Sequence, residues 1–389
     1  MMMLLLPIIY AAFISLGLPD ALLGSAWPGM HTQFQVPVSY AGLVSMIISV
    51  GTIISSLFSD RLTRTLGTGR VTALSVALTA AALFGFSAAP SFWVLCILAL
   101  PYGLGAGAID AALNNYVALH YKSSHMSWLH CFWGVGATLG PYIMGLCLTG
   151  GLGWNSGYRT IALIQMALTV ILVLSLPLWE KKKGEAGGQE EQRSLRIREL
   201  VCLPGAKVVL LAFFCYCALE QTAGLWAASY MVMGRGIPQQ TAAKWASLFY
   251  LGITLGRFLG GFLAMKLGDK DMVRLGQGLA VLGVLLLFLP MGETVLCLGL
   301  LTIGLGCAPI YPSLLHETPV NFGPGLSQSI MGMQMACAYM GNTLIPPMFG
   351  LIAQYIDIRW YPCYLILFVL IMFGAAETVN RLPKYGINS

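Results

Sequence analysis

The chain has 389 residues, of which 57% are hydrophobic and 9% are charged, with a formal net charge of +6 at pH 7. A soluble protein carries about 25% charged residues, so this composition excludes an ordinary soluble domain and indicates an integral membrane protein. No basic stripe with interleaved aromatic residues, the pattern typical of nucleic-acid binding, accompanies the positive charge. The ten cysteines form no Cys-x-x-Cys pair, which favours small buried apolar residues over a disulfide framework or a metal site.

A membrane-spanning helix requires about 20 predominantly apolar residues, and the sequence contains twelve stretches of this kind. The first starts near the N-terminus, where neither a charged segment nor a small-residue cleavage site indicates a removable signal peptide. We therefore predict an all-α membrane protein with twelve transmembrane helices. The predicted spans are 4–28, 38–58, 71–89, 92–117, 127–149, 158–179, 207–231, 242–265, 275–291, 294–315, 327–353 and 360–380.

One connection between the spans is long and polar, whereas the others are short. It contains three lysines at 181–183, a glycine pair at 187–188 and a charged run at 193–199, a composition typical of a solvated loop. We expect this segment to divide the chain into three parts. These are a six-helix bundle at 1–179, a cytoplasmic linker at 180–206 and a second six-helix bundle at 207–389.

The distribution of lysine and arginine predicts the orientation in the membrane. If the N-terminus is cytoplasmic, the inside loops and their edges hold sixteen of the 21 basic residues, in agreement with the positive-inside rule. We therefore expect a monomeric, multi-pass protein of the plasma membrane with both termini in the cytoplasm.

The two predicted bundles repeat one another in sequence. Residues 136–146 match residues 341–351 at six of eleven positions, with an offset of 205. Residues 103–105 match residues 304–306 with an offset of 201. Two parallel six-helix repeats are the layout of rocking transporters, which bind their solute near the midplane between the repeats.

Asp110 is the only charged residue in the apolar stretch 92–119. A carboxylate at such depth in a bilayer is costly unless it faces a polar cavity, so Asp110 is a candidate functional residue. Asn114 lies one helical turn further on the same face. The three glycines within 103–107 leave the preceding turns thin, so that another helix can approach closely. The alternative for Asp110 is a buried structural acid paired with a neighbouring helix.

Five short motifs in different parts of the chain carry a family resemblance. They are Ser59-Asp60-Arg61-Leu62 followed by Gly69-Arg70, Asp110 to Asn114, Gln221-Thr222-Ala223 followed by Trp226, Gly256-Arg257-Phe258, and Ile310-Tyr311-Pro312-Ser313. Together they resemble the major facilitator superfamily, and within it the fucose–proton symporter-like sugar permeases.

The resemblance implies a major facilitator fold and suggests roles for residues at the matching positions. Asp110 stands where the family carries a proton-coupling carboxylate. Asp60 and Arg61, in the motif between the second and third spans, are expected to act as gating residues at the cytoplasmic face. Arg257 is expected to extend toward the membrane interface or to bind a helix end.

Two further carboxylates lie inside predicted spans and complete the set of candidate proton-coupling residues. Asp20 follows a glycine and a proline that break a regular helix, so it either lines a site or caps a kinked helix. The family's other acid would fall at Gly24, one turn after Asp20. Glu220 lies halfway along span 207–231, where it either lines a cavity or forms an interhelical salt bridge or hydrogen bond.

Amide and aromatic side chains inside the spans suit a sugar. Sugar hydroxyls need amide or carboxylate partners, and the apolar face of a sugar ring stacks on aromatic rings. For each aromatic residue the alternative is core packing, and His130 is either a proton shuttle or an interfacial anchor. The candidate solute-binding residues are Asn114, Gln221, Trp226, Tyr311, Gln334, Asn342, Trp133 and His130.

The leading hypothesis is a secondary active transporter that moves a small polar solute by alternating access coupled to protons. A sugar is the first candidate for this solute. Sodium is the other candidate coupling ion. The alternative is a drug–proton antiporter that exports amphipathic compounds, since 19 methionines are also compatible with an apolar cavity. The sequence contains no Ser/His/Asp set, His-rich cluster or P-loop, so we expect no enzyme activity, cofactor, metal or nucleic-acid partner.

Overall fold

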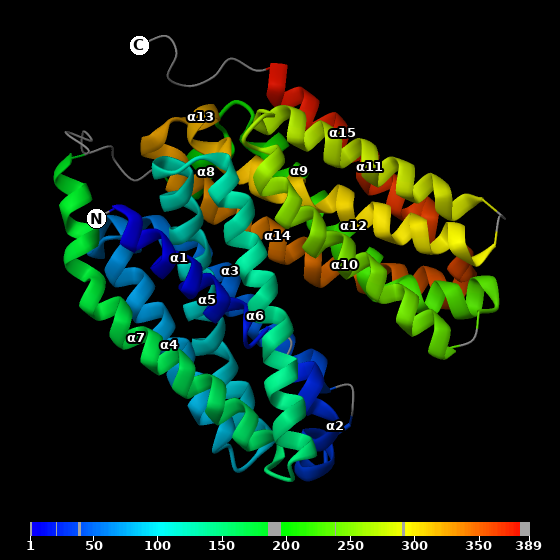
Figure 1. The fold of residues 1–389 in the computed structure, drawn as a ribbon, viewed down its shortest axis with the longest axis horizontal. Helices are drawn as coiled ribbons and strands as arrows, with labels where there is room; N and C mark the ends of the chain where they lie inside the picture. Colours follow the sequence, from blue (N-terminus) through cyan, green and yellow to red (C-terminus); the bar gives the residue numbers. More distant parts are fainter. Residues whose placement is uncertain are drawn as a thin grey trace. The chain divides into compact units, whose positions relative to one another are not determined.

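The computed structural model describes residues 2–20, 22–37, 40–185, 196–237, 239–289 and 292–381, and these residues form helices and connecting turns without a β-strand (Figure 1). The α-helices are α1 (Met2–Gly17), α2 (Leu22–Phe34), α3 (Tyr40–Leu66), α4 (Thr68–Ser87), α5 (Phe92–His120), α6 (Ser123–Thr149), α7 (Gly153–Glu185), α8 (Ile197–Val201), α9 (Ala206–Ser229), α10 (Gln239–Leu263), α11 (Asp269–Phe288), α12 (Glu293–His316), α13 (Thr318–Phe322), α14 (Pro324–Ile352) and α15 (Tyr361–Arg381). Shorter π- and 3-10 turns are η1 (Tyr230–Gly234), η2 (Ala353–Asp357) and η3 (Ile358–Trp360).

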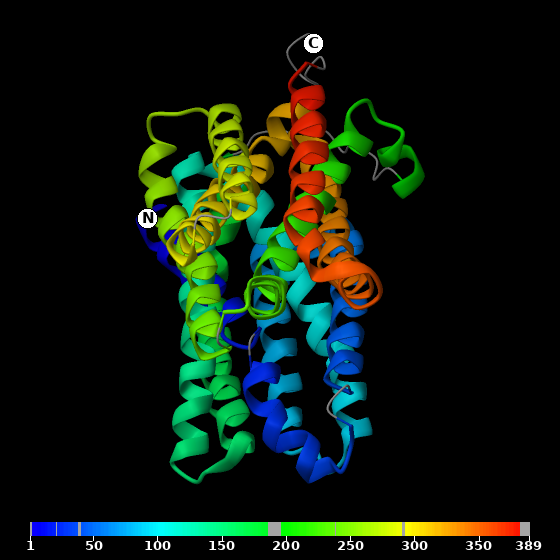
Figure 2. The same cartoon turned by 90° about the vertical axis from the view of Figure 1, so that its right-hand side faces the viewer.

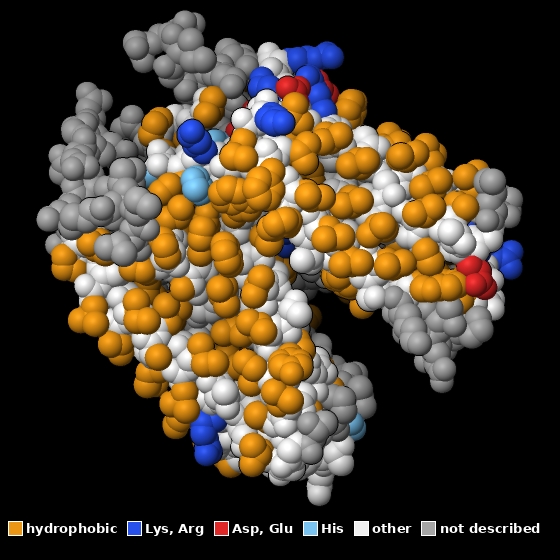
Figure 3. All heavy atoms as spheres, viewed as in Figure 1, with side chains coloured by type: hydrophobic (Ala, Val, Ile, Leu, Met, Phe, Trp, Pro, Cys, Tyr) orange, Lys and Arg blue, Asp and Glu red, His pale blue; other side chains and the backbone are white. Residues whose placement is uncertain are grey.

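Eleven stretches within the described residues are long and apolar enough to cross a membrane. The last of them, Pro324–Arg381, is 58 residues long and contains both α14 and α15, whereas about 20 residues suffice for one crossing. Large apolar side chains also remain on the outside, such as Leu174 with 76% and Ile97 with 71% of the surface exposed, and they cover much of the face in Figure 3. These observations confirm the predicted all-α membrane class.

The helices run beyond the ends that hydropathy predicts. The sixth span was predicted at 158–179, whereas α7 covers Gly153–Glu185 and includes the lysines at 181–183. The helical hydrogen-bond pattern continues through polar residues, because lysine and glutamate are good helix formers once they lie outside the apolar layer. Hydropathy therefore locates the apolar part of each helix rather than its ends.

The first predicted span is interrupted. α1 ends at Gly17, a turn covers residues 18–20, and α2 begins at Leu22. A Cβ atom on Gly17 would lie 2.1 Å from the carbonyl oxygen of Trp133, so α6 approaches the α1 backbone where only glycine leaves room. The break follows at Pro19, which cannot donate a backbone hydrogen bond, and it places Asp20 outside a regular helix.

The chain divides into two compact units by its internal contacts. The first comprises residues 1–116 and 129–194, and the second comprises residues 117–128 and 195–389. In the first unit α4 packs along α7 (Figure 1). In the second, α12 packs against both α10 and α11, and α9 packs against α14 and α15 (Figure 2). Residues 186–195 of the predicted linker lie outside the described residues.

The two units contain the same close helix contact. A Cβ atom on Gly103 of α5 would lie 2.2 Å from the carbonyl oxygen of Ile48 in α3. A Cβ atom on Gly304 of α12 would lie 2.1 Å from the carbonyl oxygen of Phe249 in α10. Both members of the pair are shifted by the offset of the sequence repeat, since 304 − 103 and 249 − 48 both equal 201. The sequence repeat is therefore also a repeat of backbone packing.

Gly105 and Gly306, the next glycines of the two repeats, make an equally close contact with a second helix, α4 in the first unit and α11 in the second. A Cβ atom on Gly105 would lie 2.8 Å from the carbonyl oxygen of Ser75 in α4, and one on Gly306 would lie 2.6 Å from that of Gly276 in α11. The same offset again relates both members, since 306 − 105 and 276 − 75 are equal. Alternate glycines thus let α5 and α12 each lie close to two helices, as the sequence predicts for the turns before Asp110.

Candidate functional site

Asp110 begins a chain of hydrogen bonds in the first unit. Asn114 Nδ2 donates to Asp110 Oδ1 at 2.8 Å, and His130 Nε2 of α6 lies 3.1 Å from Asn114 Oδ1. Because that amide oxygen can only accept, His130 donates through Nε2–H. All three side chains are buried, with 7%, 0% and 6% exposed for Asp110, Asn114 and His130. The predicted one-turn pairing is present, and His130 extends it to a second helix.

Asp20 lies at the break between α1 and α2 and binds two aromatic side chains. Trp133 Nε1 donates to Asp20 Oδ2 at 2.8 Å, and the Tyr102 hydroxyl donates to Asp20 Oδ1 at 3.4 Å. Asp20 is exposed, whereas Asp110 is buried. Within the described part of the chain neither carboxylate forms an ion pair.

The first unit therefore brings together five of the residues singled out in the sequence: Asp20, Asp110, Asn114, His130 and Trp133. Tyr102 joins them but was missed. It lies on α5 eight residues before Asp110, about two helical turns, so the helical period could have placed it on the face of Asp110. Both acids thus lie in a polar, aromatic cluster built from α1, α5 and α6.

The second unit contains a buried ion pair. Arg257 Nη2 of α10 lies 3.4 Å from Glu220 Oε1 of α9, and only 5% of Arg257 is exposed. The expectation that Arg257 extends to the membrane interface or binds a helix end is wrong, because a buried guanidinium needs an anionic partner and Glu220 supplies it. Of the two alternatives for Glu220, the interhelical salt bridge is present.

The ion pair lies among tyrosines. The Tyr311 ring of α12 lies 5.5 Å from the Tyr216 ring and 5.4 Å from the Phe213 ring, both on α9. The half-buried Tyr311 directs its hydroxyl to Met335 Sδ at 3.0 Å. Tyr216 lies four residues before Glu220 on α9, so the tyrosine and the acid of the ion pair share one face of that helix.

The other residues predicted to bind solute in the second unit have different surroundings. Gln221 is exposed, and Asn342 is half-buried. Trp226 donates through Nε1 to the carbonyl oxygen of Pro346 at 2.9 Å, so its indole N–H serves the packing of α9 on α14. Gln334 is fully buried and accepts a hydrogen bond from the Thr318 hydroxyl at 3.0 Å.

The two predicted gating residues lie near the end of α3. Asp60 is buried and accepts a bond of 2.8 Å from Arg64 Nε, one turn further along the same helix. Arg61 is exposed. Of the two, Asp60 is the one held in place by a described ion pair.

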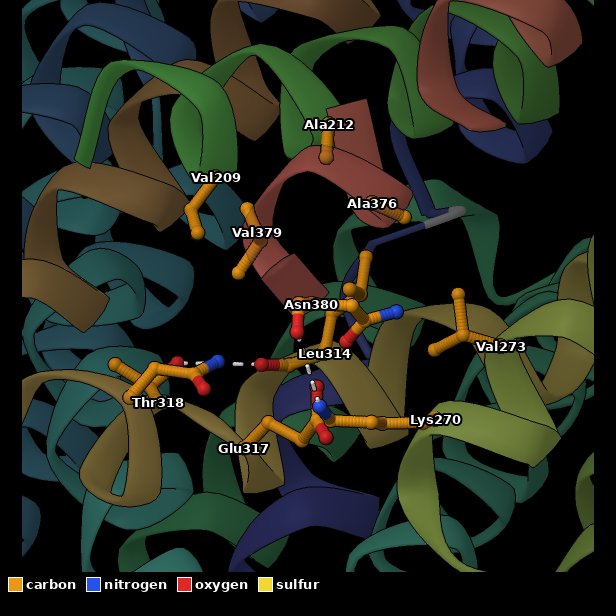
Figure 4. A pocket seen from close by; sticks show the side chains of 11 residues that line it. Val209, Ala212, Lys270, Val273, Leu314, Glu317, Thr318, Ala376, Val379 and Asn380 are labelled. Atoms are coloured by element: carbon orange, nitrogen blue, oxygen red, sulfur yellow. Dashed lines mark hydrogen bonds between the residues drawn. The ribbon is translucent and has the colours of Figure 1, made fainter. Parts of the chain in front are cut away.

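A pocket in the second unit is lined by none of the predicted site residues, although Thr318, the partner of Gln334, is part of its wall (Figure 4). Lys270, Glu317 and Asn380 also line it, and the Lys270 ammonium group lies 3.5 Å from the carbonyl oxygen of Asn380. Asn321 and several valine, alanine and leucine side chains form the rest of its wall. Among the residues that the structure describes, no group of three or more His, Cys, Asp or Glu side chains is arranged to hold a metal ion.

The repeat relates the acids of the two units. A Cβ atom on Gly136 would lie 2.1 Å from the carbonyl oxygen of Ile14, and one on Gly341 would lie 2.5 Å from that of Phe214. The partners on the first helix of each repeat therefore differ in number by 214 − 14 = 200. Asp20 and Glu220 are related by the same shift, so these acids occupy equivalent positions.

Comparison with known proteins gives a family match over most of the chain. The family model described as Major Facilitator Superfamily matches residues 9–314 and 209–382. The glucose/mannose transporter GlcP of Bacillus subtilis is 22% identical over 352 residues, which cover 88% of this chain and 86% of that protein.

Two solved structures share the fold. The transporter FucP in the outward conformation has a TM-score of 0.76 at 15% identity and covers 97% of this chain and 99% of its own. The human organic anion transporter MFSD10 has a TM-score of 0.75 at 17% identity and covers 95% of this chain and 98% of its own.

Proposed function

Since the chain belongs to the Major Facilitator Superfamily, we propose that it is a secondary active transporter that moves a small polar solute by alternating access coupled to protons. The observation that carries this proposal is the cluster of Asp110, Asn114, His130 and Asp20 in the first unit. It contains two carboxylates without a described cationic partner, in helices of transmembrane length. Intramembrane acids in such surroundings are typical of proton relays.

The cluster supports coupling because three of its groups, Asp110, Asn114 and His130, are linked by hydrogen bonds. A proton on Asp110 would remove a buried charge while Asn114 still donates to the remaining carbonyl oxygen. His130 would carry the proton state of Asp110 to α6 through the Asn114 amide. Coupling further requires that proton and solute each stabilise the state that binds the other. A solute that touches Trp133 would meet that requirement, since Trp133 donates a hydrogen bond to Asp20.

A sugar is the solute class that the relatives favour. GlcP carries glucose and mannose in its name, and a related solved structure is that of a fucose–proton symporter of E. coli. In the first unit Trp133 offers an aromatic ring on which a sugar ring can stack, and the exposed Asp20 beside it offers a carboxylate that can accept from sugar hydroxyls. The organic anion transporter MFSD10 leaves an acidic solute as a second candidate, which the buried Arg257 of the second unit favours.

Transport by purified protein in liposomes tests the proposal. With a pH-sensitive dye inside the vesicles, addition of a transported sugar should make the vesicle interior more acidic. A protonophore should abolish this acidification. Uptake that ignores the pH gradient and requires a sodium gradient would contradict proton coupling. Efflux of amphipathic dyes, without exchange of any sugar or small acid, would favour the drug antiporter instead.

Cys202 offers a test of the proposed orientation. It is exposed, whereas the other nine cysteines are buried or half-buried. It follows α8, in the predicted cytoplasmic linker next to Arg196 and Arg198. A membrane-impermeant maleimide should label Cys202 in inside-out vesicles and leave it unlabelled in intact cells. The Cys202→Ser variant controls for other thiols, and labelling of Cys202 in intact cells would contradict a cytoplasmic linker.

A further inference from the structure

Arg257 places a permanent positive charge inside a helix of transmembrane character. Trp245–Leu263 is one of the candidate membrane spans, and Arg257 lies within it with 5% of its surface exposed. A guanidinium group stays protonated in proteins, and a buried charge in a membrane span is costly and marks functional positions. Its role therefore needs an explanation beyond packing.

The contact between Arg257 and Glu220 is long for a buried ion pair, with a described nitrogen–oxygen distance of 3.4 Å. For comparison, Arg274 binds Glu377 through two nitrogen–oxygen contacts of 2.7 and 2.9 Å, the two-pronged geometry that a guanidinium and a carboxylate prefer. A carboxylate that meets Arg257 in that preferred geometry would bind it better than Glu220 does.

The repeat indicates that the fold itself does not require the positive charge. The position equivalent to Arg257 in the first unit is Ser56, since 257 − 201 = 56. Ser56 donates a hydrogen bond of 3.2 Å to the carbonyl oxygen of Gly107, and this joins α3 to α5. The acid equivalent to Glu220 is Asp20, which bonds to neutral aromatic side chains. One small hydroxyl thus suffices for helix packing where the second unit carries a cation.

The surroundings of the ion pair suit a small organic acid. Tyr216 lies one turn before Glu220 on α9, and the Tyr311 ring lies 5.5 Å from the Tyr216 ring. Glu220 itself is 18% exposed at its side chain, so the pair is not sealed from its surroundings. A cation beside aromatic rings is the combination that binds a ring or chain bearing a carboxylate.

We propose that Arg257 binds a carboxylate of the transported solute and that this carboxylate replaces Glu220 on the guanidinium group. The transported solute is then an acidic sugar or a comparable small organic acid, not a neutral hexose. This deepens the proposed function and rests on it.

The exchange also fixes a proton balance. Before binding, Arg257 and Glu220 neutralise one another. After binding, the solute anion neutralises Arg257, and Glu220 takes up a proton from solution because a carboxylate without a cation is costly in a buried position. One solute anion and one proton therefore bind together, and the site stays neutral overall.

Matched pairs of ligands test the inference on the purified full-length protein. Glucose and glucuronate differ at one carbon, where the acid has a carboxylate in place of a hydroxymethyl group, and galactose and galacturonate form a second pair. In a thermal-shift and calorimetric screen of such pairs, the acid should bind and its neutral counterpart should bind on the order of 100-fold more weakly. Binding of the acid in weakly buffered solution should take up about one proton per molecule, as that exchange requires.

Variants then assign the effect to the ion pair. Glu220→Gln should bind the acid more tightly, since the competing carboxylate is gone, and should abolish the proton uptake on binding. Arg257→Gln should remove the preference for the acid. If that variant does not fold, the Arg257→Gln/Glu220→Gln double variant removes both charges together and should fold while lacking the preference. Arg274→Gln, which breaks the Arg274–Glu377 pair, is the matched control and should keep the preference.

The outcomes separate this inference from the proposed function. If neutral sugars bind and exchange while the acids of the panel do not, or if the double variant still prefers the acid, Arg257 is structural and the transporter proposal stands. If no compound of the panel binds, the inference is also overturned. If an acid binds with uptake of a proton but is not transported into liposomes, Arg257 is a binding site for a carboxylate, and the proposed transport function is wrong.

Discussion

Asp110→Asn is expected to abolish solute accumulation driven by a pH gradient while counterflow exchange of the solute continues. Asparagine keeps the size of aspartate and presents a carbonyl oxygen to Asn114 Nδ2, which lies 2.8 Å from the carboxylate. The variant therefore keeps the hydrogen bond but cannot gain or lose a proton. Accumulation should fall to the level of protein-free liposomes, and exchange should stay within about threefold of the wild type, since asparagine mimics the protonated form of Asp110 and exchange does not require this residue to release its proton.

The control for this prediction is the other acid of the same cluster. Asp20→Asn should also keep its fold, because Asp20 is exposed and its partners Trp133 and Tyr102 can donate to an amide oxygen. Thermal stability of each variant should be measured beside transport to separate loss of coupling from loss of fold. If Asp110→Asn still accumulates solute in a proton-dependent way and Asp20→Asn does not, the coupling role belongs to Asp20 and Asp110 is structural.

The sequence predicts the Asp110–Asn114 pair of this cluster, because both residues lie on a single helix. Asp110 and Asn114 are four residues apart, so helix geometry alone places them on one face. The bond from Trp133 to Asp20 joins residues 113 positions apart. It requires both the chain break after Gly17, which Gly17 and Pro19 predict, and the packing of α6 on α1, which the sequence of either helix does not reveal. Tyr102 was missed because its hydroxyl matters only once Asp20 is placed beside it.

Arg257 is a residue whose partner cannot be predicted from its own helix. Within α10 it is one cation among apolar residues, which fits a side chain that extends to an interface. Only the packing of α9 on α10 reveals Glu220 as its partner, 37 residues away in sequence. The ratio of polar to apolar residues in one span cannot show which residue the neighbouring span offers.

Trp226 shows why a residue type does not settle a role. An indole ring inside a span can stack on a sugar or pack against a neighbouring helix, and the sequence does not distinguish the two roles. In the structure its N–H binds the Pro346 carbonyl, and its ring lies 5.5 Å from that of Phe349. Both partners lie on α14, more than a hundred residues from Trp226 in sequence. The repeated glycines predict helix contacts better than Trp226 does, because a glycine contact depends on the backbone alone and not on the orientation of a side chain.

Gly103→Ala and Gly304→Ala are expected to lower stability strongly and to similar extents. The added methyl groups would meet the carbonyl oxygens of Ile48 and Phe249 at 2.2 and 2.1 Å, well inside van der Waals contact. The obstacle in each case is backbone, so a side chain cannot turn aside and two helices must separate. Overpacking typically lowers the free energy of unfolding by about 1–3 kcal/mol. Because two helices must separate along their whole contact, we expect the loss in these variants to be at or above the upper end of that range.

The controls are glycines in helices with open space around them. Gly134 in α6 and Gly374 in α15 have no atom within 4 Å of an added Cβ. Their alanine variants should be as stable as the wild type or more so, since alanine favours a helix over glycine by about 1 kcal/mol. Thermal unfolding of detergent-purified protein, with size-exclusion profiles, measures the four variants side by side. Equal stability of all four would refute the close helix contacts, and a loss at Gly103 alone would show that the second repeat packs differently.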